Sequence, residues 1–348
     1  MSLQGTLLDA VPGAAEWPAP CPGGSAIPMQ THAWMHARTA LLAQPSSLRI
    51  YAVRNGDAIE ALAPFVRVGE WLREPPMMFE PSDLVWSTPE SLRELAAILA
   101  GQPLPVCLDR VPVGSATIPA LRRAYSGRGV VLVGAAMPTP VIELGVPSHV
   151  VDSCLNAGRR SDLRRAERRA RGLGTVDFEL HSPAREGELA PLIDEAYAVE
   201  ARSWKARTGT ALTADAWQGA FIRRFARCAA QEGILRIAFL RIDGQAAAMQ
   251  IAAQWQRRFW LFKISYDLAF SHCSPGQLLM LHTLRHAART GLLSYEFMGL
   301  MDDWTKQWTR QARQYVQIRA FPFSAATGRM LVRRGARSIA GRLRRFTR

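Results

Sequence analysis

The sequence predicts a mixed α/β protein built from two lobes of related fold. The chain has 348 residues, more than one hydrophobic core usually organises. Its apolar residues follow the period of strands in some segments and that of helices in others. The segments Leu48–Asp57 and Leu235–Gly244 also resemble each other, since both begin Leu-Arg-Ile and pass through a glycine turn into an alanine-rich strand. This internal echo favours two related lobes.

The first lobe is expected over residues 31–147. Residues 1–30 are rich in proline, glycine and alanine and are predicted to form a loose lead-in. Asn55-Gly56 is a strong hairpin signal between two strands. The elements expected in this lobe are helices at 31–43, 89–100 and 116–125 and strands at 48–53, 58–68, 105–109, 130–133 and 141–144.

The second lobe is expected over residues 148–324, followed by a basic C-terminal helix within residues 325–348. It opens with a long basic helix over 148–171, which Gly172 and Gly174 end. The remaining elements expected here are helices at 186–204, 214–231, 275–290 and 303–311, strands at 176–181, 235–242, 245–254, 258–265, 295–298 and 315–321, and the terminal helix at 331–346.

Composition indicates a globular protein of the cytoplasm. No segment reaches the roughly 18 apolar residues that a membrane span needs, and the N-terminus lacks the basic start and apolar run of a signal peptide. The five cysteines are scattered without metal-ligand spacing. His282 and His286 share a helix face, but no glutamate accompanies them as in a zinc protease motif, so we expect no metal.

The formal net charge of +14 is unevenly distributed. Trp304–Arg348 contains Lys306 and eleven arginines but no acidic residue, and Arg159–Arg171 is a second arginine-rich block. Such blocks suit an anionic membrane surface, where they would hold the protein against the inner membrane, or RNA. A solvated helix face is the alternative.

Lysine is rare in this chain. Of 43 basic residues only Lys205, Lys263 and Lys306 are lysine. A compact ammonium fits tight sites that a planar guanidinium does not. The three lysines are therefore candidate functional residues. The alternative is that they are present by chance and have no special function.

The segment Phe259–Gly276 carries the most chemical information. An aromatic strand leads to Tyr266-Asp267, and after a loop Ser274-Pro275-Gly276 opens a helix. The N-terminus of a helix that follows a strand presents free amides, which bind phosphate. An ordinary capped helix has the same pattern and remains open here.

This order of motifs resembles the CelD/BcsL-type acetyltransferases, members of the GNAT superfamily related to the FemAB aminoacyltransferases. Glu200 followed by Trp204-Lys205 resembles the Glu-x-x-x-Trp-Lys element of that family, and the arginine block and the late Lys306 and Trp308 have counterparts. The resemblance covers roughly residues 48–321. The spacing from Lys306 to Trp308 is one residue shorter than the family pattern.

The resemblance implies two tandem GNAT-like lobes, each a central mixed sheet flanked by helices. Acetyl-CoA or another acyl-CoA would bind the second lobe as co-substrate. The residues expected to hold its pyrophosphate are Ser274, Gly276, Gln277 and Leu278. The acyl thioester is expected near Ile264 and Ser265.

Acyl transfer to an amine needs a base, a donor to the leaving thiolate and stabilisation of the oxyanion. Asp267 and Glu296 are the candidate bases and Tyr266 is the candidate acid. The alternative is that the two carboxylates lie on the surface and the tyrosine in the core, without a catalytic role. Lys306 is expected to stabilise the oxyanion or to bind an acceptor phosphate. The residues expected to contact the acceptor are Trp204, Lys205, Lys263 and Trp308.

The function expected is N-acyl transfer from acyl-CoA to an amine of a small molecule, an amino sugar or a polysaccharide or envelope precursor. A FemAB-like enzyme that uses aminoacyl-tRNA as donor is one alternative. The other is a non-catalytic module that docks on RNA or an anionic membrane through Arg159–Arg171 and the C-terminal arginines.

Overall fold

The computed structural model describes residues 3–21, 24–25, 27–75, 80–144, 155–325 and 327–329. The chain divides into two compact units, each discontinuous in sequence. Unit 1 comprises Met1–Gln30, Leu42–Met137 and Gln314–Arg348, and unit 2 comprises Thr31–Leu41 and Pro138–Arg313. The predicted lobes 31–147 and 148–324 divide the chain differently, because helix α1 (His32–Thr39) and the second half of a long strand group with unit 2.

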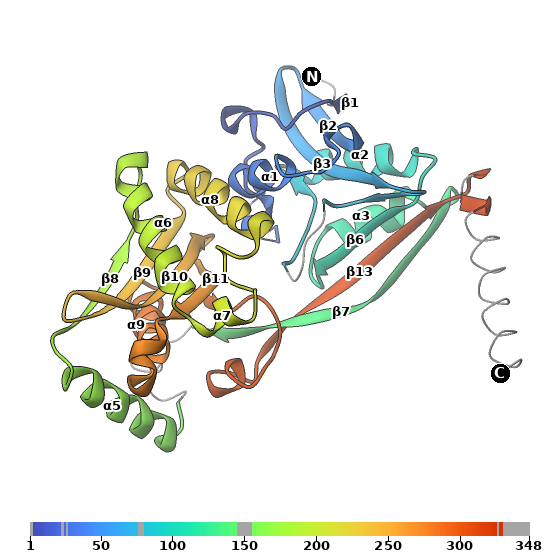
Figure 1. Ribbon diagram of the computed structural model, residues 1–348. Helices are drawn as coiled ribbons and strands as arrows, with labels where there is room; N and C mark the ends of the chain where they lie inside the picture. The colour runs from blue at the N-terminus through green and yellow to red at the C-terminus, as the bar shows by residue number, and fades with distance from the viewer. Residues whose placement is uncertain are drawn as a thin grey trace, which may run out of the picture. The chain divides into compact units, whose positions relative to one another are not determined.

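Unit 1 is built on a mostly antiparallel sheet. Its strand order is β1 (Leu3–Leu8), β2 (Leu48–Asn55), β3 (Ala58–Val68), β4 (Trp71–Arg73), β6 (Val106–Pro112) and β13 (Ala312–Pro322), with β5 (Val85–Trp86) beside β3. Only the β4–β6 pair is parallel among the pairs described in this unit. Helices α2 (Pro89–Ala100) and α3 (Thr117–Ala124) cover one face and bury Leu95, Leu99 and Leu121 against the strands (Figure 1).

Unit 2 contains a second mixed sheet. Its order is β7 (Gly129–Glu143, whose residues from 138 belong to this unit), β12 (Ser294–Glu296), β11 (Arg258–Tyr266), β10 (Gln245–Trp255), β9 (Leu235–Ile242) and β8 (Val176–His181). Strands β8 to β11 are antiparallel to their neighbours, whereas β11 and β12 run parallel. The parallel pair is possible because helix α9 (Pro275–Arg289) forms the crossover between the two strands.

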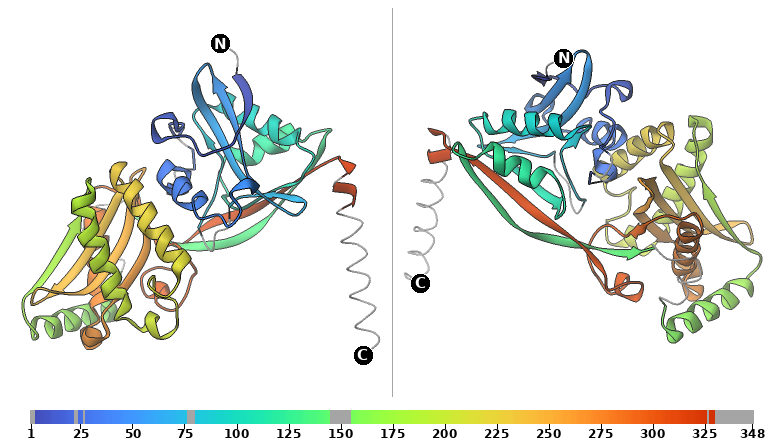
Figure 2. Two further views of the ribbon diagram at one scale, coloured as in Figure 1. Left: turned by 45° about the horizontal axis from the view of Figure 1, so that its top comes forward. Right: turned by 180° about the vertical axis from the view of Figure 1, so that it is seen from behind.

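Helices cover both faces of this sheet. Helices α6 (Glu186–Ala201) and α8 (Ala216–Gln231) lie on one face, and α9 with α5 (Ala157–Arg171) lies on the other (Figures 1 and 2). Strand β9 therefore buries residues of both parities, such as Phe239 and Leu240. The strongly polar α5 is held through Leu163, Ala166 and Ala170, whose spacing of three and four places them on one helix face.

The sequence predicted most elements correctly. The predicted bounds of α2, β8 and β9 agree with the structure at both ends. Residues 3–8 were expected to be loose, which is wrong, because they pair along β2. The two short strands predicted at 130–133 and 141–144 are one strand, β7. The residues predicted as helix at 148–154 and 331–346 lie outside the described residues.

Two predicted helices are shorter than expected. The helix predicted over 186–204 ends at Ala201, because Ser203 caps a separate short helix, α7 (Trp204–Arg207), by accepting a hydrogen bond from the amide of Lys205. The helix predicted over 303–311 is a single 3-10 turn, η5 (Thr305–Gln307), and the chain enters β13 at Ala312. No helix in the described part of the chain is long and apolar enough to cross a membrane.

Helix α1 is anchored to unit 2 by one tryptophan. Trp34 is 2% exposed, and its ring lies 4.8 Å from that of Phe221, 5.2 Å from that of Phe225 and 5.3 Å from that of Phe262, measured between centroids. Phe221 and Phe225 belong to α8 and Phe262 to β11. Aromatic packing therefore ties an N-terminal helix to the centre of unit 2.

Replacing Trp34 with alanine should detach α1. The loss of the buried ring and its three aromatic contacts should lower the free energy of unfolding by about 3–5 kcal/mol. Amide exchange along α8 should accelerate with it. The matched control is Phe323→Ala, since Phe323 is 71% exposed. Urea titration and hydrogen exchange test this; equal stability of the two variants would show that α1 contributes nothing to unit 2.

Candidate active site

A cavity of about 440 Å³ lies in unit 2 where β11 ends and α9 begins. It brings together residues from α7, β11, the first turn of α9 and the loop before η5. The lining residues are Trp204, Lys205, Ile264, Ser265, Tyr266, Ser271, Ser274, Gly276, Gln277 and Trp304. Eight of these ten were predicted site residues; Ser271 and Trp304 were not.

The strands of the sheet diverge beside this cavity. Strand β11 pairs with β12 only from Arg258 to Trp260, and then continues to Tyr266 after β12 has ended. The register between β10 and β11 also shifts between Ile251 and Ala252. The last residues of β11 are therefore available to a ligand on the side that β12 leaves open.

The first turn of α9 forms the opposite wall. Ser274 adopts the left-handed conformation (φ 50°, ψ 52°), and Pro275 occupies the first helical position. A side-chain carbon added to Gly276 would lie 3.4 Å from Cδ1 of Tyr266, so any larger side chain here would project against that ring. The partial positive charge of this helix end favours an anion at its amides. Leu278 does not line this cavity, because its side chain is in the core and its amide donates to the carbonyl of Ser274.

Lys205 is fixed by a buried ion pair. Its Nζ donates to Oε1 of Glu200 at 2.9 Å and to the carbonyl of Ile264 at 2.7 Å. The second oxygen of Glu200 accepts from the amide of Leu212 at 2.7 Å. The ammonium thus holds the end of β11 to the α6–α7 segment. The sequence pattern included Glu200, but nothing in it indicated the contact with Ile264.

Ser265 presents an unused hydroxyl to the cavity. The residue is 3% exposed, and its Oγ is buried without a hydrogen-bond partner among the described residues. A buried hydroxyl without a partner costs about 1–3 kcal/mol. A polar ligand atom in the cavity would satisfy it.

The two carboxylates predicted as bases have structural partners. Asp267 caps the 3-10 helix after β11 by accepting from the amide of Ala269, and it pairs with Arg202. Neither carboxylate lines the cavity. Tyr266 does line it, so among the four predicted catalytic residues it has the position closest to the expected chemistry.

Glu296 is the more tightly held of these two carboxylates. It is almost fully buried, and its Oε1 lies 3.1 Å from Nη1 of Arg258 and 2.6 Å from Nη2 of Arg313. Both of its oxygens also accept from Nε of Arg313. This environment favours a structural role over that of a base.

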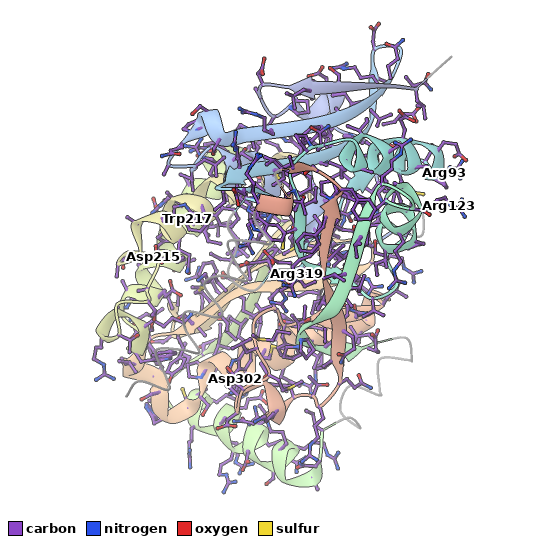
Figure 3. The ribbon with its side chains drawn as sticks, turned by 90° about the vertical axis from the view of Figure 1, so that its right-hand side faces the viewer. Arg93, Arg123, Asp215, Trp217, Asp302 and Arg319 are labelled. Atoms are coloured by element: carbon purple, nitrogen blue, oxygen red, sulfur yellow. The ribbon has the colours of Figure 1, made fainter. Side chains whose placement is uncertain are left out.

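The other predicted residues lie away from this cavity. Lys263 donates to Gln218 on α8, the helix that Asp215 caps and on which Trp217 is labelled in Figure 3. Lys306 is half-exposed and pairs with Asp303 at 3.2 Å. Trp308 is buried and donates through Nε1 to Gln277 at 3.0 Å. No cluster of three or more potential metal ligands occurs among the described residues.

The comparisons with known proteins agree with this geometry. Residues 157–306 match the family model described as "Acetyltransferase (GNAT) domain". This part of the chain is similar to GNAT acetyltransferase domains. It includes β8 to β12, α9 and the whole cavity lining. No sequence among curated proteins matches the chain.

Solved structures show the same fold over most of the chain. FemX is 10% identical with a TM-score of 0.55, and the match covers 85% of this chain and 92% of that one. A conserved protein of unknown function from Bacteroides thetaiotaomicron is 11% identical with a TM-score of 0.55, over 88% and 95%. The C-terminal domain (DUF2156) of a protein named as a lysylphosphatidylglycerol synthetase, from Agrobacterium fabrum, is 10% identical with a TM-score of 0.54, over 86% and 93%. The predicted mixed α/β fold, with sheets flanked by helices, is confirmed.

Glu200→Gln should destabilise unit 2. The substitution leaves the ammonium of Lys205 buried without its counter-charge, and breaking a buried pair in this way typically costs about 3–5 kcal/mol. Arg227→Gln is the control, because it breaks an exposed pair with Glu186 and should change the free energy of unfolding little. Urea unfolding of both variants compares them, and a Glu200 variant as stable as the control would exclude a structural role for the pair.

Proposed function

We propose that the protein is an N-acyltransferase of the CelD/BcsL type that acts in the cytoplasm. It would transfer an acyl group from acetyl-CoA or another acyl-CoA to an amine of a small molecule, an amino sugar or a polysaccharide or envelope precursor. The observation that carries the proposal is the cavity where β11 leaves β12 and meets the first turn of α9, within the GNAT domain.

The residues of this cavity suit a nucleotide thioester. The amide of Gly276 and the partial positive charge at the start of α9 would hold the pyrophosphate, whereas the amides of Gln277 and Leu278 already donate to the carbonyl of Ser274. The thioester would then lie along the end of β11, where the hydroxyl of Ser265 has no other partner among the described residues. A hydrogen bond from Ser265 to the carbonyl oxygen would stabilise the oxyanion that forms during attack.

In the transfer itself, the amine nitrogen bonds to the carbonyl carbon and the carbon–sulfur bond breaks. Tyr266 lines the cavity and would protonate the departing thiolate. The cavity lining contains no carboxylate or histidine among the described residues. The acceptor amine would therefore enter in its neutral form, and the proton that its nitrogen loses after attack would pass through solvent to reprotonate Tyr266. Trp204, 45% exposed on α7, offers an aromatic face to the acceptor.

A FemAB-like enzyme that takes an aminoacyl group from tRNA is the second candidate. The observation in its favour is the series of exposed arginines on α5, which includes Arg164, Arg168 and Arg169. An RNA donor would neutralise several phosphates, so its affinity would fall steeply with salt. Affinity for acyl-CoA would change less.

A thermal-shift panel of acyl-CoAs and tRNA tests the donor. A ligand at one hundred times its Kd stabilises the native state by about 2.7 kcal/mol. Acetyl-CoA should raise the melting temperature, and Gly276→Val should abolish the shift because its side chain blocks the approach to the amides. Gly187→Val is the matched control, since open space surrounds that position. A folded Gly276 variant with wild-type affinity would refute the assignment of the donor site.

Ser265→Ala should slow the acyl-transfer step. Loss of one oxyanion donor typically lowers turnover about 10²–10³-fold. Affinity for acyl-CoA should change little, because the pyrophosphate contacts remain. The variant should also be at least as stable as the wild type, since it removes an unsatisfied buried hydroxyl. Single-turnover kinetics and isothermal titration separate these effects; undiminished turnover would remove Ser265 from the chemistry.

A further inference from the structure

A second cavity of about 650 Å³ lies in unit 2 on the other side of Gln277. Its lining includes Arg159 at the start of α5, Lys306 and Trp308 in and after η5, and Arg310. The two cavities share a wall, because Oε1 of Gln277, which lines the first, accepts from both Arg159 and Trp308, which line the second.

The charges in this cavity are unbalanced. Among the described residues that line it, three cationic side chains face one carboxylate, Asp162, which also pairs with Arg165. Within the same part of the chain Lys306 pairs with Asp303 alone, a fully exposed residue whose attraction water largely screens. No hydrogen bond or ion pair of Arg310 is found within the part of the chain that the structure describes. The cavity therefore keeps excess positive charge.

Arg159 is held rigidly at the back of the cavity. Its guanidinium lies 4.9 Å from the centroid of the Trp308 ring and donates to Gln277. Its Nε is buried and has no partner among the described residues. Burial lowers the pKa of Arg159, and the charge of Asp162 offsets part of this effect. A ligand anion beside Arg159 would offset the rest.

Backbone amides add to the positive electrostatic potential of this cavity. Helix α5 begins here, and its N-cap Asn156 accepts from the amide of Arg159 at 2.8 Å. The amides of Ala157 and Gly158 have no acceptor within the helix, as in any first turn. Asn156 and Gly158 both line the cavity.

We infer that this second cavity binds a phosphate group of a ligand that also occupies the first cavity. Arginine forks, an ammonium and helix amides form the donor set that suits phosphate. The inference rests on the proposed function and extends it to the substrate. Either the donor or the acceptor would extend past Gln277 from the first cavity, so that its phosphate lies in the second. It also favours phosphate binding by Lys306 over oxyanion stabilisation, because Lys306 does not line the first cavity.

Titration with inorganic pyrophosphate tests the site directly. Arg310→Gln should weaken binding about tenfold, as for loss of one charge-assisted hydrogen bond. Arg310 is exposed, so this variant should fold normally, and Lys306→Gln should behave in the same way. The matched control is Arg168→Gln, an exposed arginine on α5 outside the cavity, which should bind as the wild type does.

Comparing acetyl-CoA with its dephospho form, which lacks the 3′-phosphate, identifies the source of the phosphate. If the donor supplies it, the wild type should bind acetyl-CoA about tenfold more tightly than the dephospho form, and Arg310→Gln should erase that preference. If the acceptor supplies it, the two donors should bind equally and pyrophosphate should bind alongside acetyl-CoA. Either result supports the site.

Three results would overturn the inference: no pyrophosphate binding by the wild type, equal weakening by Arg310→Gln and Arg168→Gln, or loss of pyrophosphate binding in Gly276→Val alone. The proposed function is judged separately, by the thermal shift with acetyl-CoA, so the two can fail independently.

Discussion

The buried ion pair between Glu200 and Lys205 is the interaction on which the candidate active site depends. One carboxylate and one ammonium join the end of α6, the amide of Leu212 and the carbonyl of Ile264. Ile264 belongs to the part of β11 that β12 no longer supports. Lys205 therefore donates a side-chain hydrogen bond to the backbone of β11 at a point where β12 no longer pairs with that strand. An arginine would present a wider planar group with a different donor geometry.

Much of the fold could be predicted because its signals are local. Thr88 and Pro89 mark the start of α2, and the apolar residues of β9 followed by the turn at Asp243-Gly244 mark that strand and its end. Strand β7 was predicted as two short strands, and Pro138 and Pro140 lie between them. In the structure the stretch that pairs with β12 begins at Val141, after both prolines, and Pro140 still offers its carbonyl to Phe297. Proline ends a ladder only where its missing N–H is needed.

The candidate site was predictable to the same extent. Ser274, Gly276 and Tyr266 follow one another closely in sequence, so a strand-to-helix connection was enough to bring them together. The structural role of Glu296 was not predictable, because one of its partners, Arg258, lies 38 residues earlier at the start of another strand. Lys306 was proposed because lysine is rare in this chain, but the rarity of a residue type does not predict which residues surround it in the fold. The tertiary structure places it with Arg159 and Arg310 in the lining of the second cavity, and it does not line the first.

The position of α1 has a consequence for how the chain folds during synthesis. Trp34 leaves the ribosome about 190 residues before Phe225 and about 230 residues before Phe262, the residues on which it packs. At about 5–20 residues per second, these aromatic partners follow only after about 10–45 s. During that interval Trp34 lacks the rings that bury it in the folded protein. The packing of α1 in unit 2 is therefore completed only after β11 has been synthesised.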